Sequence, residues 1–160
     1  MRTRLRIRDT RATELPMLTA LALRAKGHWG HAPAVLERMR AELTWDVQAL
    51  ARCRFRCAEA PQTGLVGFSA VAFVDAEAAE LEALFVDPPW IGMGHGRALL
   101  EDAVAIARAS ARRRMLIHSD PDAEGFYLQA GARRIGVVPS GSIAGRMLPL
   151  LELDLRADAP

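Results

Sequence analysis

The order of hydrophobic and polar residues in this chain changes between a period of two and a period close to 3.6. Residues 4–9 (RLRIRD) and 51–59 (ARCRFRCAE) place apolar and polar side chains in turn, which is typical of strands with one buried face. Leu15, Leu18 and Leu21 instead share one face of a helix. The pattern as a whole predicts strands over residues 4–9, 51–59, 65–74, 80–86, 114–119, 133–138 and 147–155, and helices over residues 14–26, 33–43, 95–110 and 121–130.

Capping residues set the expected ends of several helices. Thr13 is expected to cap the first helix, and Gly27 to end it. Thr44 is expected to cap a short turn over residues 45–49. Asp120, which a proline follows directly, is expected to start the last helix.

These elements are expected to form one mixed sheet. The three strands between residues 51 and 86 are joined by short turns, so they form an antiparallel meander. The helix over 95–110 then leads from the strand at 80–86 to the strand at 114–119, and a right-handed crossover makes these two strands parallel. The sequence therefore predicts a single α/β domain over residues 1–160, with a mostly antiparallel sheet, one parallel strand pair and helices on both faces.

A glycine-rich loop separates the strand at 80–86 from the helix that follows it. Asp87-Pro88-Pro89 ends the strand, because proline cannot donate a hydrogen bond to a ladder. Gly92, Gly94 and Gly96 then lead into a helix. Unpaired amides at a helix N-terminus favour negative charge, so this arrangement predicts a phosphate site. It is neither a Walker loop, since no Gly-Lys-Ser/Thr follows, nor a Rossmann fingerprint, since Arg97 stands where the third glycine would fall.

The composition excludes several classes of protein. The formal net charge of +2 demands no polyanionic partner, and the arginines at 112–114 are expected to lie in a solvated turn, so no nucleic-acid binding is predicted. No signal peptide is recognised, and no stretch approaches the roughly 18 apolar residues of a membrane span, so we expect a cytoplasmic protein without membrane contact.

The two cysteines, Cys53 and Cys57, fall on one face of the same expected strand. Four residues of strand span roughly 13 Å, which is too far for a disulfide. No other cysteine or histidine has zinc spacing, so no metal is expected. Both thiols are interpreted as small core residues.

Two motifs resemble the GNAT N-acetyltransferase superfamily. The apolar strand, Val86-Asp87-Pro88 and the glycines before Arg97 are similar to its acetyl-CoA loop, although Ile91 stands where arginine or glutamine is usual. Residues 122–132 (DAEGFYLQAGA) resemble a second motif of the superfamily, with Asp122 in place of the usual asparagine. The order of the elements also matches, and residues 23–30 and 139–151 are similar to a subgroup of small bacterial enzymes.

The resemblance implies that acetyl-CoA is the acyl donor and that an amine of a small molecule is the acceptor. In similar proteins the main chain near Phe85 and Val86 splays from the parallel strand and binds the pantetheine arm. The glycine loop binds the pyrophosphate, and Arg97 is a suitable charged partner there. The implied donor-binding residues are Phe85, Val86, Gly92, Met93, Gly94, His95, Gly96, Arg97, Asp122 and Phe126.

Catalytic candidates follow from the same resemblance. Tyr127, the only tyrosine of the sequence, is expected to be the general acid that protonates the leaving thiolate. Glu82 is the first candidate for the base, and Glu80 is the second. On the alternation of a strand, Glu82 is expected to share a face with Leu84. His118 lies in an apolar strand and is expected to be a core or hydrogen-bonded residue.

The acceptor pocket is expected to be bordered by His28, Trp29 and His31, and either histidine is also a possible proton acceptor. Arg146, in a glycine-rich loop, suits a bidentate contact with a carboxylate of the acceptor, although structural pairing explains it equally well. Two other functions stay open, a non-catalytic acyl-CoA-binding sensor and an interaction scaffold. A homodimer is possible, but no residue pattern decides it.

Overall fold

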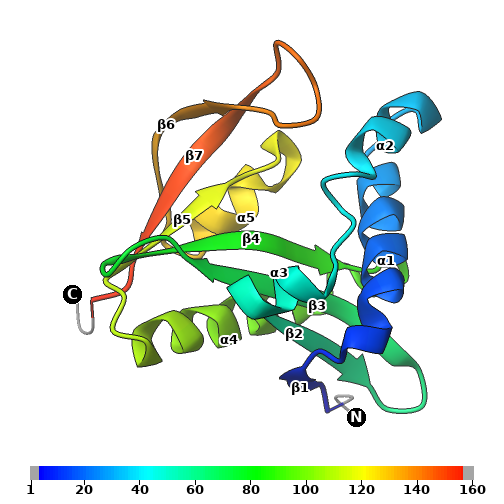
Figure 1. Cartoon of the computed structure of the whole chain (residues 1–160), viewed down its shortest axis with the longest axis horizontal. Helices are drawn as coiled ribbons and strands as arrows, with labels where there is room; N and C mark the ends of the chain where they lie inside the picture. The colour runs from blue at the N-terminus through cyan, green and yellow to red at the C-terminus, as the bar shows by residue number, and fades with distance from the viewer. Residues whose placement is uncertain (1–3, 157–160) are drawn as a thin grey trace.

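A computed structural model of the protein describes residues 4–156 and contains a single seven-stranded sheet with helices packed on it (Figure 1). The strands are β1 (Arg6–Asp9), β2 (Cys53–Ala60), β3 (Gly64–Phe73), β4 (Ala78–Val86), β5 (Arg114–His118), β6 (Arg133–Pro139) and β7 (Met147–Asp154). The helices are α1 (Leu15–His28), α2 (Pro33–Met39), α3 (Val47–Arg52), α4 (His95–Ala109) and α5 (Glu124–Gln129), with single 3-10 turns η1 (Ala12–Glu14), η2 (Pro88–Trp90) and η3 (Pro121–Ala123). No helix in this part of the chain is both long and apolar enough to span a membrane.

The strand order is β1-β2-β3-β4-β5-β7-β6. Every neighbouring pair is antiparallel except β4 and β5, which are parallel and joined through α4. This confirms the predicted mixed α/β fold with one parallel strand pair.

The parallel pairing of β4 and β5 is short. It runs from Ala78 opposite Arg114 to Leu81 opposite Ile117, whereas β4 continues to Val86. Beyond Leu81 the two strands separate, and the β5 edge of β4 loses its partner. The sheet therefore opens in its middle, at the carboxyl end of the parallel pair.

Each face of the sheet has its own core. On one face, Leu18 and Leu21 of α1 pack with Phe55 and Phe68 of the meander. On the other face, α4 contributes Leu100, Ala103 and Ala107 to a core that also contains β5 and β7 residues. Figure 1 shows α1 and α4 on opposite sides of the sheet, as the sequence predicts.

The ends of the first two helices differ from those predicted from the sequence. Thr13 lies inside the turn η1 and does not cap α1, which begins at Leu15. Gly27 lies within the last turn of α1, whose final residue is His28. The second helix ends at Met39 instead of residue 43, because the chain turns through Arg40 to reach the next segment.

The segment before β2 forms a helix where the sequence predicts a turn and a strand start. Asp46, not Thr44, caps this helix, because its carboxylate accepts a hydrogen bond from the Ala49 amide at 3.0 Å. The Thr44 hydroxyl instead donates to the carbonyl of Arg40. Residues 51 and 52 therefore belong to α3, and β2 begins only at Cys53.

Candidate active site

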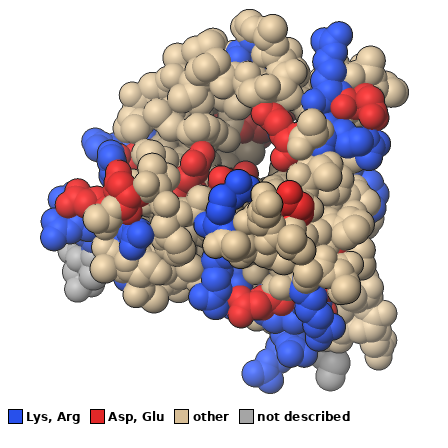
Figure 2. Space-filling view, viewed as in Figure 1, with Lys and Arg blue, Asp and Glu red and all other residues tan. Residues whose placement is uncertain are grey.

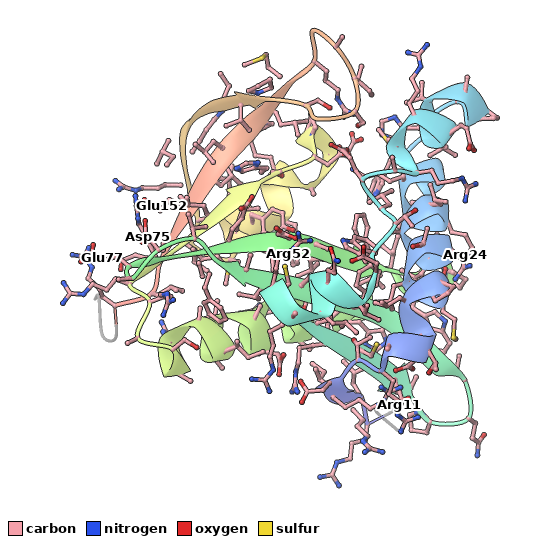
Figure 3. The ribbon with its side chains drawn as sticks, viewed as in Figure 1. Arg11, Arg24, Arg52, Asp75, Glu77 and Glu152 are labelled. Carbon is pink, nitrogen blue, oxygen red and sulfur yellow. The ribbon has the colours of Figure 1, made fainter. Side chains whose placement is uncertain are left out.

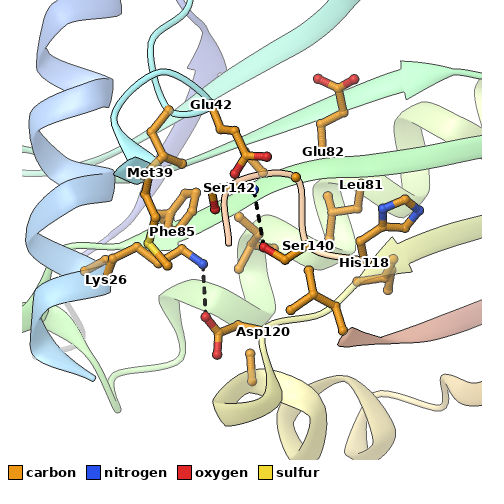
Figure 4. A pocket seen from close by; sticks show the side chains of 18 of the residues that line it. Lys26, Met39, Glu42, Leu81, Glu82, Phe85, His118, Asp120, Ser140 and Ser142 are labelled. Atoms are coloured by element: carbon orange, nitrogen blue, oxygen red, sulfur yellow. Dashed lines mark hydrogen bonds and ion pairs between the residues drawn. The ribbon is translucent and has the colours of Figure 1, made fainter. Parts of the chain in front are cut away.

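A cavity of about 450 Å³ lies where β4 and β5 separate (Figure 4). Its size is in the range of small-molecule sites. Its walls come from α1, the segment between α2 and α3, β4, the end of β5, η3 with α5, and the loop between β6 and β7. The predicted site residues that line it are Trp29, Glu80, Glu82, Phe85, His118, Asp122, Tyr127 and Arg146.

Tyr127 lies on α5 and is almost entirely buried, with 6% of its surface exposed. Burial raises the pKa of its phenol well above the usual value, and the negative charge of Asp120 adds to this. The hydroxyl therefore keeps its proton at neutral pH. A protonated phenol on the wall of a cavity can act as an acid toward a bound group.

Asp120, directly after β5, joins both sides of the cavity. Its carboxylate accepts a hydrogen bond from Lys26 Nζ of α1 at 3.0 Å and lies 3.6 Å from the guanidinium of Arg146 (Figure 4). Burial alone would raise the pKa of Asp120, but the charge and hydrogen bond of Lys26, the amide of Asp122 and the charge of Arg146 lower it. Asp120 is therefore ionised and fixes the β6–β7 loop relative to α1.

Arg146 lines the cavity while it pairs with Asp120. Only 22% of its side chain is exposed. The structural pairing that the sequence left open is therefore present. Lys26 and Arg146 share the Asp120 carboxylate, and Asp122 and Glu42 also line this part of the cavity, so charges of both signs meet here.

The β4 strand has a bulge at Glu82. Ala83 pairs with Ala70 and Leu81 with Val71, so no residue of β3 lies opposite Glu82. The extra residue breaks the alternation of the strand, and the prediction that Glu82 shares a face with Leu84 is wrong. Its carboxylate accepts a hydrogen bond from the Cys53 thiol at 3.3 Å. This contact lies on the side of the sheet that α1 and α3 cover.

His118 is the last residue of β5, and of the two alternatives expected for it, a core residue or a hydrogen-bonded one, the structure contradicts the first. Its side chain is 45% exposed and lines the cavity. Its Nε2 lies 3.5 Å from Oε1 of Glu80 on the neighbouring parallel strand. An imidazole and a carboxylate thus stand together beside the point where the strands part.

The glycine-rich loop lies outside the residues that line the cavity. Gly92 and Gly94 have φ values of 83° and 85°, a region that strains any side chain, so glycine is required in this loop. Gly94 is the N-cap of α4, and as a glycine it has no side chain that could accept a hydrogen bond from the first amides of the helix. The amides of the first turn, from His95 onward, are therefore available to an anion.

Arg97 extends from the first turn of α4, with 80% of its side chain exposed, and its Nε lies 3.3 Å from a carboxylate oxygen of Glu101 one turn later. His95 is buried and faces the ring of Trp90. At the other end of the loop, Arg24, which Figure 3 labels on α1, donates two hydrogen bonds of 3.0 Å to the carboxylate of Asp87. This pair ties the start of the loop to α1.

Phe126 connects the loop with the cavity. Its ring lies 3.5 Å from the position that a Cβ of Gly96 would occupy, and Val86 Cγ2 lies 3.7 Å from the same position. Phe126 also meets Tyr127 edge to face, with ring centroids 5.0 Å apart. The first turn of α4 and the cavity wall are thus in contact through two consecutive residues of α5.

Of the three residues expected around the acceptor, only Trp29 lines the cavity. His28 packs against the Trp29 ring, with centroids 5.1 Å apart. His31 turns toward Asp120, with Nε2 3.8 Å from Oδ2. Both histidines support the wall from outside it.

Sequence reasoning missed Lys26, Asp120 and Glu42 as cavity residues. Lys26 and Asp120 lie 94 residues apart, and no local pattern relates them. Glu42 reaches the β6–β7 loop, where a Cβ on Gly141 would overlap its carboxylate. The glycines of that loop are a local signal for such a close approach.

The distribution of charged side chains bears on the kind of ligand that the surface could hold. Over the described part of the chain, no group of histidine, cysteine, aspartate and glutamate side chains could hold a metal ion. Figure 2 shows acidic and basic side chains interspersed over the face that it presents. Both cysteines are buried and unpaired, as predicted.

Comparison with known proteins gives a consistent result. The model of the acetyltransferase (GNAT) family matches residues 17–132. The solved structures include PaiA N-acetyltransferase from Thermoplasma acidophilum in complex with coenzyme A, with 17% identity and a TM-score of 0.75 over 94% of this chain and 99% of that one. A GCN5-related N-acetyltransferase from Rhodopseudomonas palustris has 14% identity and a TM-score of 0.77 over 96% and 98% of the two chains.

YncA from Salmonella typhimurium, solved with acetyl-CoA, has 18% identity and a TM-score of 0.67 over 99% of this chain and 98% of that one. At such identities the likeness establishes the fold. No curated protein matches the sequence.

Proposed function

The chain belongs to the GNAT acetyltransferase family, and on this premise we propose that it transfers the acetyl group of acetyl-CoA to an amine of a small molecule. The observation that carries the proposal is the cavity between the parting strands, with a buried phenol on one wall and an imidazole and carboxylates on another. An acetyl transfer to an amine needs an acid for the thiolate and a base for the ammonium, and both kinds of group line this cavity.

Two features support the path that we propose for the donor. Its pyrophosphate binds the glycine loop and the first turn of α4, where the residues are Gly92, Met93, Gly94, His95, Gly96 and Arg97. The pantetheine arm runs along β4 past Val86 and Phe85, and binds the backbone that lacks a partner beyond Leu81. Phe126 and Asp122 border this path from the side of α5 and η3.

The proposed reaction converts an alkylammonium and acetyl-CoA into an N-acetyl amine and free coenzyme A, and it releases one proton. The acceptor first loses a proton from its ammonium, since an alkylammonium has a pKa near ~10.4 and cannot attack. The amine nitrogen then bonds to the thioester carbon, the carbon–sulfur bond breaks, and the second nitrogen proton passes in net to the thiolate. We propose that Tyr127 delivers a proton to the sulfur and is restored from the nitrogen.

Glu82 and Glu80 are the carboxylates that the sequence selects as the base, and both line the cavity. The proposed function requires that a basic group on this wall takes the first proton. Arg146 and Trp29 are proposed to contact the acceptor from the opposite side, where the guanidinium of Arg146 suits an acceptor that carries a carboxylate.

The experiment is a screen of small amines with acetyl-CoA, in which release of free thiol is followed and products are identified by mass spectrometry. The proposal predicts thiol release that depends on one class of amine and forms its N-acetyl derivative. Binding of acetyl-CoA without turnover on any amine would favour a non-catalytic acyl-CoA sensor instead.

A further inference from the structure

We infer that His118, oriented by Glu80, is the group that takes the proton from the acceptor amine. The inference rests on the proposed function and identifies the base that it leaves unassigned. It starts from one contact, the 3.5 Å between Nε2 of His118 and Oε1 of Glu80.

The sheet explains why these two side chains meet on the wall of the cavity. In the parallel register Glu80 is opposite Leu116, and His118 follows two residues later on the same face. Ile117, which lies between Leu116 and His118 in the sequence, points into the core under α4. The last parallel pair is Leu81 with Ile117, so His118 stands at the point where the strands separate.

The pair has the geometry of an oriented base. A carboxylate facing Nε2 favours the tautomer with its proton on that nitrogen, which leaves the lone pair on Nδ1, at the other edge of the ring. The carboxylate also stabilises the imidazolium that forms when Nδ1 accepts a proton. With 45% of its side chain exposed, His118 can return that proton to water.

His118 suits the task better than Glu82. Catalysis by a base is most efficient when its pKa lies near the working pH, and imidazole titrates near neutrality whereas a carboxylic acid titrates near ~4. Glu82 projects from a bulge, and its carboxylate is occupied on one oxygen by the Cys53 thiol. In this scheme Glu82 contributes negative charge that attracts the acceptor ammonium.

Other charged groups face His118 from several elements, and some of them are paired. On β7, Glu152 is held by Arg114 and Arg133 at 3.3 and 2.9 Å (Figure 3). Beyond the end of β5, Asp120 is held by Lys26. Across the cavity stand Glu42, Asp122 and the protonated Tyr127. Glu80 is therefore the carboxylate that acts on the imidazole directly, with Glu82 next to it along β4.

The proton balance is simple. Nδ1 of His118 accepts one proton from the acceptor ammonium, which yields the neutral amine and an imidazolium beside Glu80. After the acetyl group has moved, the imidazolium gives this proton to water, and the histidine is restored. Tyr127 acts on the separate proton that reaches the sulfur.

The test is the pH dependence of kcat/KM for the wild-type protein and for His118→Gln, Glu80→Gln and Glu82→Gln, measured with the best amine of the screen. The wild type is expected to lose activity below neutrality as an essential base becomes protonated. This fall is the acidic limb of its pH profile. His118→Gln should lower kcat about 100-fold, within the ~10²–10⁴ range for acid–base groups, and should abolish this acidic limb. Imidazole added to His118→Ala should restore part of the rate.

Glu80→Gln should keep the acidic limb but lower kcat by a smaller factor than His118→Gln does, because the imidazole loses the carboxylate that orients it. Glu82→Gln should leave the position of the limb unchanged. If the wild type is active and His118→Gln keeps both its kcat and its acidic limb, the inference is overturned. It is also overturned if Glu82→Gln is the only variant that loses the acidic limb. A wild type that acetylates no amine would instead overturn the proposed function, so the two failures are distinguishable.

Discussion

The rings of Phe126 and Tyr127 meet edge to face, with centroids 5.0 Å apart and an angle of 70° between their planes. One ring packs over Gly96 in the first turn of α4, and the other forms part of the cavity wall. Two neighbouring residues of one short helix thus fix the position of the glycine loop relative to the cavity. In the proposed function, the thioester of a donor bound at the loop is directed past this pair.

Replacing Tyr127 by phenylalanine removes the proposed acid and keeps the ring. We expect kcat to fall about tenfold or more, because the thiolate then leaves without a positioned proton. The melting temperature and the affinity for acetyl-CoA should change little, since the ring still fills its place in the core. Unchanged kcat at saturating amine would remove Tyr127 from the mechanism.

The buried phenol also makes stability depend on alkaline pH. The folded protein holds the Tyr127 proton at a higher pKa than the unfolded chain, in which tyrosine ionises near ~10. Stability from this group is complete below pH ~10 and falls as the pH rises further, by up to about 1.4 kcal/mol per pH unit.

Urea unfolding of the wild type and Tyr127→Phe between pH 8 and 11 measures this effect. The variant should lose less free energy of unfolding above pH ~10 than the wild type does. The buried thiols of Cys53 and Cys57, whose pKa values are also raised, are common to both proteins and cancel in the comparison. Parallel curves for the two proteins would show that the phenol ionises freely in the folded state.

Gly67 on β3 lies against the strand that lines the cavity. A Cβ there would be 2.8 Å from the backbone oxygen of Phe85 and 3.1 Å from Leu99 Cδ1. Gly67→Ala should lower the free energy of unfolding by about 1–3 kcal/mol, because backbone must move to admit the methyl group. Gly136→Ala, where a Cβ meets nothing within 4 Å, is the matched control and should stay within about 0.5 kcal/mol. Equal effects of the two substitutions in urea unfolding would contradict the close approach.

Arg146 is predicted to select acceptors that carry a carboxylate. Arg146→Ala should raise KM about tenfold for such amines and should leave amines without a carboxylate nearly unchanged. Arg134→Ala is a suitable control, since it removes an arginine that pairs with Glu124 and does not line the cavity. An equal rise in KM for every acceptor would mean that Arg146 acts only through its pairing with Asp120.

Most of the fold follows from local patterns in the sequence. The alternation of β2 and the apolar run of β3 identify the meander, and the helix between β4 and β5 identifies the parallel pair. Helix ends are harder to predict, because Asp46 and Thr44 are both good capping residues and only the packing of α3 on β2 selects Asp46.

The site is less accessible to sequence reasoning than the fold. The glycine loop carries a local signal, whereas Phe126 and Tyr127 are predicted only through the resemblance of residues 122–132 to a family motif. The bulge at Glu82 depends on the register with β3, so a strict alternation assigned that side chain to the wrong face. The exposure of His118 depends on where β4 and β5 part, and the Lys26–Asp120 pair depends on contacts between distant segments.

The most direct test of the central claim, that the loop and cavity bind acetyl-CoA, is a thermal-shift titration with acetyl-CoA, with coenzyme A and ATP alongside. A ligand at about a hundredfold excess over its Kd stabilises the folded state by roughly 2.7 kcal/mol, which raises the melting temperature of a domain of this size by several degrees. We predict a saturable rise with acetyl-CoA and with coenzyme A, and none with ATP. No rise with either form of the coenzyme would contradict the account and would indicate that Ile91 and Asp122 mark a lost donor site.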